Sequence, residues 1–235
     1  MPTPTQTVPM TTSGSSSRVD VLDQLLHERH SCRAFLPDAV PDSTIERLLL
    51  LAQRTPSWCN TQPWKVVVTR GQGTDRMRRA LTAADDEEPD LPFPEAYNGP
   101  YRDRRRAAAR RLYQAVGVQW GDRAASAREA ARNFELFDAP HLAVITTDTG
   151  LGTYGAVDCG LYVQTFLLAA QALELGAIPQ AAIAARSRTV RQVLNLTDDR
   201  MVLCGISFGL PDPNNPGAAV HAERASLSDV VTYLD

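Results

Sequence analysis

The sequence predicts an α+β or α/β domain in which helices outnumber strands. Four short apolar segments have the composition of strands, at residues 65–69, 142–146, 177–184 and 201–208. Segments whose apolar residues recur every three or four positions separate them, as expected for helices. The 235 residues contain no internal repeat and no linker that divides them, so we expect a single domain over 18–235.

The first half of the chain is predicted to form three helices and one strand. Apolar residues recur at helical spacing from Val19 to Leu26, which predicts a helix that ends at about Arg29. A second helix begins at Asp42 or Ser43, because Glu46 follows Ser43 at the spacing of a capping box. Three consecutive valines predict a buried strand at 65–69, and a helix follows to about residue 83.

The second half begins with a segment of unusual composition. Residues 85–100 hold an acidic run and four prolines, which favours a loop, and helices are predicted at about 102–117 and 122–136. The helix predicted at 156–175 is apolar almost all round, so we expect it to be buried inside the subunit or against a partner. Shorter helices are predicted at 189–194 and near Val230, after a Pro/Asn/Gly turn at 209–217.

Composition and charge argue against several classes of function. The net charge of -3 gives no reason to expect a nucleic-acid partner. The four cysteines form no Cys-x-x-Cys pair, so we expect no metal site and buried thiols in a reducing compartment. These cysteines are Cys32, Cys59, Cys159 and Cys204.

Two segments bear on where the protein resides. Residues 1–17 are uncharged and rich in Thr, Ser and Pro, and they lack the basic start and apolar run of a signal peptide, so we predict a disordered tail. The apolar segment 156–175 includes Asp158 and Glu174, which makes it a poor membrane span. We therefore expect a cytoplasmic protein with no membrane partner.

A basic cluster at residues 29–35 is the first candidate for chemistry. Arg29 and Arg33 lie four residues apart, so in a helical turn they share a face, with Ser31 between them. Two guanidinium groups and a hydroxyl suit an anion such as a phosphate. Alternatively, these basic residues interact with the dipole at the end of the first helix.

A second cluster, at residues 54–64, combines two tryptophans, two amides and two prolines just before a strand. The amides of Asn60 and Gln62 can pair with the edge of a planar heterocycle, and Trp58 can stack on an aromatic ring. The alternative is a tight turn into the strand, with Trp64 in the core.

Together these clusters resemble the opening of the FMN-dependent nitroreductase family. The resemblance rests on Arg29-x-Ser31-x-Arg33 followed by Pro56-Ser57-x-x-Asn60-x-Gln62-Pro63-Trp64. Three later stretches agree with the family, at residues 178–182, 205–213 and 221–227. The family fold is a three-layer α+β sandwich in which helices wrap a mixed sheet and two subunits intertwine as a homodimer.

The resemblance implies specific contacts with FMN at the dimer interface. Arg29, Ser31 and Arg224 would hold the phosphate, and Arg33 would lie near the pyrimidine edge of the flavin. The residues at 56–62 would come from the opposite subunit, and those at 179–181 would face the flavin ring. The full expected set is Arg29, His30, Ser31, Arg33, Pro56, Ser57, Trp58, Asn60, Gln62, Pro179, Gln180, Ala181 and Arg224.

The implied activity is an NAD(P)H-dependent FMN nitroreductase that passes hydride through flavin N5 to nitroaromatic or quinone-like acceptors in a ping-pong cycle. Since the flavin carries the redox chemistry, no catalytic side chain is required. The alternatives are a dehydrogenase or dehalogenase of the same fold, or an FMN-binding protein without turnover.

Two further features bear on the donor and the acceptor. The arginine-rich segment 102–111 either attracts the 2′-phosphate of NADPH, which favours NADPH over NADH, or forms a solvated face neutralised by the acidic run. The Gly71-x-Gly73 pattern is not a dinucleotide fingerprint, because Arg76 occupies the third glycine position. We expect residues 85–120 to form a lid over the cleft, and the candidate substrate residues are Trp58, Tyr97, Tyr101, Tyr113 and Trp120.

Overall fold

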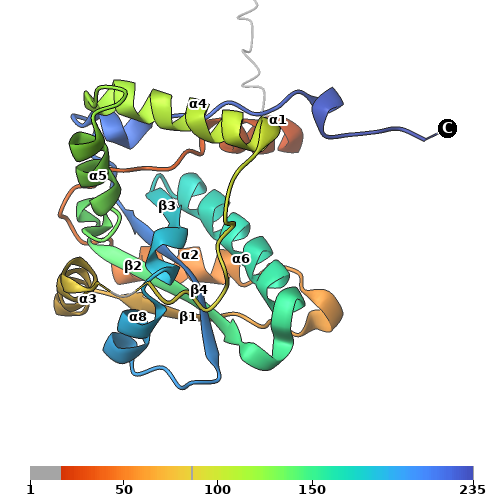
Figure 1. Cartoon of the computed structure of the whole chain (residues 1–235). Helices are drawn as coiled ribbons and strands as arrows, with labels where there is room; N and C mark the ends of the chain where they lie inside the picture. The colour runs from red at the N-terminus through yellow and green to blue at the C-terminus, as the bar shows by residue number, and fades with distance from the viewer. Residues whose placement is uncertain (1–16, 86, 235) are drawn as a thin grey trace, which may run out of the picture.

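The computed structural model describes residues 17–85 and 87–234 (Figure 1). The predicted disordered tail at 1–17 lies outside the described residues, except for Ser17. The Ser17 hydroxyl accepts a hydrogen bond from Asp20 N at 3.1 Å and caps the first helix, α1 (Arg18–Glu28).

Four strands form one sheet at the centre of the molecule. They are β1 (Lys65–Thr69), β2 (His141–Asp148), β3 (Gly176–Gln180) and β4 (Arg200–Gly209). Their order is β1-β2-β4-β3 and all three pairings are antiparallel. The chain is therefore α+β. The mixed sheet that the resemblance implies is not found among these four strands, because each one runs opposite to its neighbours.

Helices cover both faces of the sheet, and alternate residues of β2 face the two sides. Ala143 and Ile145 pack with α2 (Asp42–Ala52) and α6 (Gly152–Ala172). Leu142 and Val144 pack on the other face with α3 (Gln72–Ala83), α7 (Ala181–Ala184) and α8 (Ser187–Leu194). The helices α4 (Gly99–Val116) and α1 lie at the top of the view, and α5 (Arg123–Ala131) descends beside them (Figure 1).

Several predicted elements differ from the structure at their ends. The strand predicted at 177–184 ends at Gln180, and residues 181–184 turn into α7, because three of these four residues are alanine, the strongest helix former. The helix predicted at 122–136 ends at Ala131, before Leu136, Phe137 and Asp138 adopt positive φ. The strand at 65–69 is an edge strand and only partly buried, because it pairs with β2 alone.

The apolar helix α6 is buried on one side only. Cys159, Tyr162 and Phe166 are buried in the core, whereas Tyr154 and Val157 are 62% and 53% exposed on the opposite side. Burial raises the pKa of Cys159 to about 11, which confirms that this thiol is a small buried side chain. The prediction of buried thiols fails at Cys59, which is exposed because it lies in a surface turn.

Two absences hold for residues 17–85 and 87–234. No group of three or more His, Cys, Asp or Glu side chains is placed to hold a metal ion there. No helix in this part of the chain is long and apolar enough to span a membrane.

The buried His141 links stability to pH. Val40 N donates a hydrogen bond to Nε2 of His141 at 3.0 Å, and burial lowers the pKa of His141 below its ordinary value of 6.5. Between 6.5 and the lowered pKa of folded His141, the unfolded chain therefore binds more protons than the folded chain. The free energy of unfolding should fall as the pH falls from 6.5 through the pKa of the folded form. Urea unfolding at a series of pH values should show this loss. It should be smaller in His141→Gln, whose amide oxygen can still accept from Val40, and equal losses in both proteins would contradict the assignment.

Candidate functional site

A cavity of about 640 Å³ lies where α1 ends beneath α4. Arg29, His30 and Ser31 follow the last residue of α1 and line the cavity. His221 and Arg224 reach it from the C-terminal segment, while Ala108 and Leu112 of α4 line it as well. Segments separated by nearly the whole chain therefore meet at one cavity.

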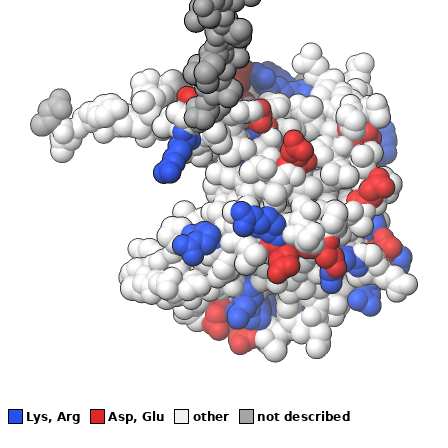
Figure 2. Space-filling model, turned by 180° about the vertical axis from the view of Figure 1, so that it is seen from behind, with Lys and Arg blue, Asp and Glu red and all other residues white. Residues whose placement is uncertain are grey.

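The cavity carries positive charge without a matching acid. Arg29 and Arg224 form no ion pair within the part of the chain that the structure describes. Burial and the nearby Arg224 lower the pKa of Arg29. The rings of His30 and His221 lie 4.4 Å apart, and burial, His30 and Arg29 lower the pKa of His221. Clustered cations that lack counter-charges favour a bound anion. Seen from behind, the molecule is hollowed beneath the projecting C-terminal segment, and basic side chains border the hollow (Figure 2).

A second cavity of about 410 Å³, which we call the ring cavity, shares Arg33 and Leu112 with the first. Pro179, Gln180 and Ala181 line it at the end of β3. The amide of Gln180 is already engaged, because its Oε1 accepts from Ser207 Oγ at 2.5 Å and its Nε2 donates to Asn133 O at 2.9 Å. The side-chain amide of Gln180 is therefore held by Ser207 and Asn133, and this turn meets the cavity at the end of the edge strand β3.

The loop at residues 56–62 is held in a strained conformation. Cys59, Asn60 and Gln62 have φ of 51°, 55° and 47°. Strain of this kind persists only where surrounding contacts fix it, and it concentrates at functional sites. Here Asp158 accepts a hydrogen bond from Trp58 N at 3.1 Å, and Ser57 Oγ accepts one from Gln62 N at 2.9 Å.

A chain of side-chain hydrogen bonds continues from this loop into the core. Trp64 Nε1 donates to Gln53 Oε1 at 3.0 Å, and Gln53 Nε2 donates to Gln62 Oε1 at 2.9 Å. Trp64 itself is buried, as expected. Gln53 therefore orients the amide of Gln62, a role that the sequence did not indicate because Gln53 lies at the end of α2, outside the motif.

A single chain keeps the two predicted clusters apart. The loop is tied to α6 at Asp158, whereas the end of α1 is tied to the same helix at Gln171, whose Nε2 contacts Glu28 at 3.4 Å. Gln171 lies 13 positions after Asp158, which corresponds to roughly 20 Å along a helix. The prediction that the loop comes from the opposite subunit agrees with this separation and stays a prediction.

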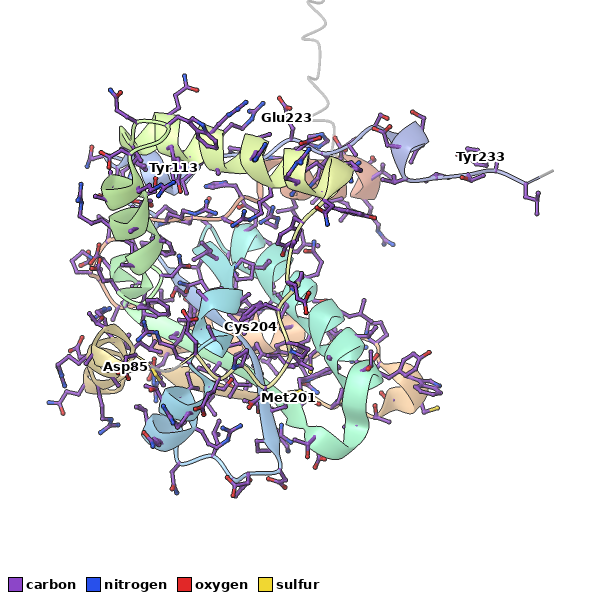
Figure 3. The ribbon with its side chains drawn as sticks, viewed as in Figure 1. Asp85, Tyr113, Met201, Cys204, Glu223 and Tyr233 are labelled. Atoms are coloured by element: carbon purple, nitrogen blue, oxygen red, sulfur yellow. The ribbon has the colours of Figure 1, made fainter. Side chains whose placement is uncertain are left out.

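The five candidate substrate residues do not converge in one chain. Tyr113, which is labelled in Figure 3, lines the ring cavity, and the ring centroid of Trp120 lies 6.1 Å from that of Tyr113. Tyr97 and Tyr101 are 45% and 67% exposed. Trp58 packs against Tyr154 at 4.7 Å beside a separate cavity of about 310 Å³.

Within residues 17–85 and 87–234, arginines of α4 pair with acids outside the acidic run, Arg102 with Asp103 and Arg111 with Glu223, as in a solvated face with local ion pairs. Asp90 instead pairs with Arg191 at 2.8 Å. It also accepts a hydrogen bond at 2.7 Å from Val202 N, in the part of β4 that extends beyond its pairing with β3. Glu88 pairs with Arg188 at 3.1 Å. These contacts hold the region around 88–90 against α8 and β4, because arginines there offer closer partners. Within the predicted lid, α4 is the part that lies over the cavities.

Comparison with known proteins gives a consistent result. A family model described as the nitroreductase family matches residues 26–210. The chain is 34% identical over 215 residues to the nitroreductase NfnB of Mycolicibacterium smegmatis, which covers 90% of this chain and 92% of the relative. It is 31% identical over 219 residues to a chloronitrobenzene nitroreductase of Comamonas testosteroni, covering 91% and 96% of the two chains.

Two solved structures are similar along nearly their whole length. The FMN-dependent nitroreductase NfnB from Mycobacterium smegmatis in complex with NADPH matches with a TM-score of 0.88 and 32% identity, over 93% of this chain and 100% of that one. The FMN and NADPH-dependent nitroreductase NfnB from sphigopyxis sp. strain HMH matches with a TM-score of 0.86 and 27% identity, over 91% and 98%.

Removing the carboxylate that anchors the strained loop should release it. We expect Asp158→Ala to lose about 1–3 kcal/mol of stability, because Trp58 N–H would lose a charged acceptor. Urea unfolding would measure this loss, and the fluorescence of Trp58 would report the loosened loop. A variant as stable as the wild type would show that the Asp158 contact does not hold the loop.

Proposed function

Because the chain belongs to the nitroreductase family, we propose that it is a homodimeric FMN enzyme that uses NAD(P)H to reduce nitroaromatic acceptors. The observation that carries this proposal is the pair of adjoining cavities, one lined by Arg29, Arg33 and Arg224 and the other by Arg33 and the 179–181 turn. The chain is thus an oxidoreductase, and relatives named as nitroreductases match it over about nine-tenths of its length.

The residues of both cavities fit FMN. Arg29, Ser31 and Arg224 offer the two unpaired cations and the hydroxyl that a phosphate dianion needs. The combined lining continues past Arg33 to the 179–181 turn, where backbone groups are available to a planar ring. Each cavity falls in the size range of roughly 300–1,000 Å³ that is typical of ligand sites.

Bound FMN would supply the redox chemistry, by accepting two electrons from the donor and passing them to the acceptor. The chain contributes binding and electrostatics. Arg33 is partly buried, with Nη1 donating to Ser31 O at 3.1 Å, and its positive charge would favour the anionic, reduced state of a flavin beside it. Donor and acceptor would use the same ring cavity in turn, which supports a ping-pong order.

A second copy of the chain would complete the site. The exposed side of α6 presents Tyr154, Val157 and Leu161, which form apolar surface next to the strained loop. The C-terminal segment projects away from the body, and Tyr233 and Leu234 on it are 79% and 99% exposed (Figures 1 and 3). Apolar residues on an extended arm gain stability by packing on a partner.

The arginines of α4 support NADPH as the preferred donor. Arg105 lines the ring cavity, and α4 carries further arginines towards its exposed side. A 2′-phosphate near them would find cations that the acidic run does not neutralise. Quinone-like acceptors are part of the same proposal, because a cavity that accepts a planar ring would admit a quinone as well as a nitroaromatic.

Anaerobic mixing of the FMN-loaded protein with NADPH, and separately with NADH, tests the proposed function. We expect the flavin absorbance to bleach rapidly, faster with NADPH, and to return when a nitroaromatic is added. A purified protein that takes up no FMN, or whose bound FMN is bleached by neither donor, would overturn the proposal.

A further inference from the structure

Glu129 of α5 is a carboxyl group in the ring cavity with an oxygen that has no partner. It lines the cavity together with Arg33 and the 179–181 turn. Its side chain is 10% exposed, and Oε1 is buried with no hydrogen bond within residues 17–85 and 87–234. The other oxygen, Oε2, lies 3.9 Å from Arg132 Nη1, which is too long for a hydrogen bond.

The charges around this carboxyl group oppose one another. Burial raises the pKa of Glu129, Arg132 and Arg33 lower it, and Glu135 raises it; the net direction is upward. A buried carboxylate without a hydrogen bond is costly, whereas the protonated form is less so. Burial thus extends the protonated form of Glu129 to higher pH than is ordinary for glutamate.

Reduction of a nitro group requires a proton that the donor does not supply. Conversion of a nitro to a nitroso group takes two electrons and two protons, breaks one N–O bond and releases one water molecule. NADPH supplies both electrons and one proton, so one more proton must come from the protein or the solvent. A positioned acid at this point typically accelerates such a step by about 10²–10⁴-fold.

We propose that Glu129 is the proton donor to the acceptor in the ring cavity, a role that rests on the function proposed above. The O–H bond of the carboxyl group breaks and its proton goes to the nitro oxygen that leaves as water. The carboxylate then takes a proton back from solvent, once in each cycle. Glu129 accordingly serves the acceptor step and has no part in the step that oxidises NADPH.

Other groups in the cavity are poorer donors. The guanidinium groups of Arg33 and Arg105 line the cavity as hydrogen-bond donors rather than as acids. Tyr113 also lines the cavity, and its phenol is the competing candidate. The variants that separate these possibilities are Glu129→Gln and Tyr113→Phe. Glu135→Gln is the matched control, since it removes a nearby carboxyl group that is not part of the cavity lining.

The experiment follows the two half-reactions separately in the FMN-loaded dimer. Reduction by NADPH should proceed at the wild-type rate in Glu129→Gln. Reoxidation by 4-nitrobenzoate should slow by about 10²-fold or more. Reoxidation by ferricyanide, which takes electrons and no proton, should be unchanged. The wild-type rate with 4-nitrobenzoate should fall as pH rises through the pKa of Glu129, and this dependence should vanish in the variant.

Three kinetic results would overturn the assignment. Reoxidation of Glu129→Gln by 4-nitrobenzoate at the wild-type rate would show that no proton passes through this residue. Equal slowing with ferricyanide would indicate a structural role. Slowing of similar size in Tyr113→Phe, without slowing in Glu129→Gln, would assign the donor to the phenol. The control Glu135→Gln should be reoxidised by 4-nitrobenzoate at the wild-type rate at low pH, and its fall in rate should move to lower pH, because Glu135 raises the pKa of Glu129.

An infrared titration gives a readout that does not depend on turnover. The wild-type protein should keep the carbonyl band of a protonated carboxyl group to higher pH than is ordinary for glutamate, and Glu129→Gln should lack this part of the titration. Identical spectra would overturn the proposal even if the kinetics agreed. Failure of the wild type to bind FMN would instead overturn the function proposed above, and the infrared result would still decide the protonation state of Glu129.

Discussion

The length of α6 is the constraint on which the rest of the site depends. This helix is attached to the strained loop at Asp158, lines the basic cavity at Gln164, and contacts Glu28 at the end of α1 through Gln171. Asp158 and Gln171 are roughly 20 Å apart along the helix axis. The proposed site takes the loop from a second copy, and the separation between the loop and the end of α1 along α6 supports that proposal.

The same constraint explains features that look unfavourable in a single chain. Arg29 and Arg224 lie close together without counter-charges, a costly arrangement unless an anion binds between them. Three residues of the loop keep positive φ because Ser57, Asp158 and Gln53 fix their neighbours. Tyr154 and Val157 on the apolar side of α6, and Tyr233 and Leu234 on the C-terminal arm, are largely exposed in the single chain. In each case one chain bears a cost that a bound FMN and a second subunit would offset.

Sequence patterns predicted the core elements well and their surroundings less well. Three valines located β1 at residues 65–69, because strand propensity and burial act locally there. The predicted end of β3 was wrong. The alanine-rich segment 181–184 fits a helix pattern and a strand pattern equally well until the neighbouring elements are known. The partners of Asp90 were missed for a related reason, because a charge run gives no sign of which distant arginine it meets.

The candidate site divides in the same way. Arg29, Ser31 and Arg33 form a local motif, so their shared cavity could be expected from spacing. Glu129 and Gln53 belong to no motif, and their importance rests on burial and on one or two contacts that only the folded chain creates. His221 joins His30 across nearly the whole length of the chain, and only the family resemblance of residues 221–227 indicated that these two segments meet.

Subunit complementation tests the central claim most directly. One variant, Arg29→Ala/Arg224→Ala, removes the basic half of the site, and a second, Asn60→Ala/Gln62→Ala, removes the loop half. Random mixing of subunits yields one half mixed dimers, each with one intact site of two, so about a quarter of the wild-type FMN content should return. Each variant alone should bind little FMN. Recovery near a quarter supports a site shared between two chains, whereas a mixture that binds no more FMN than its parents would place the whole site in one chain.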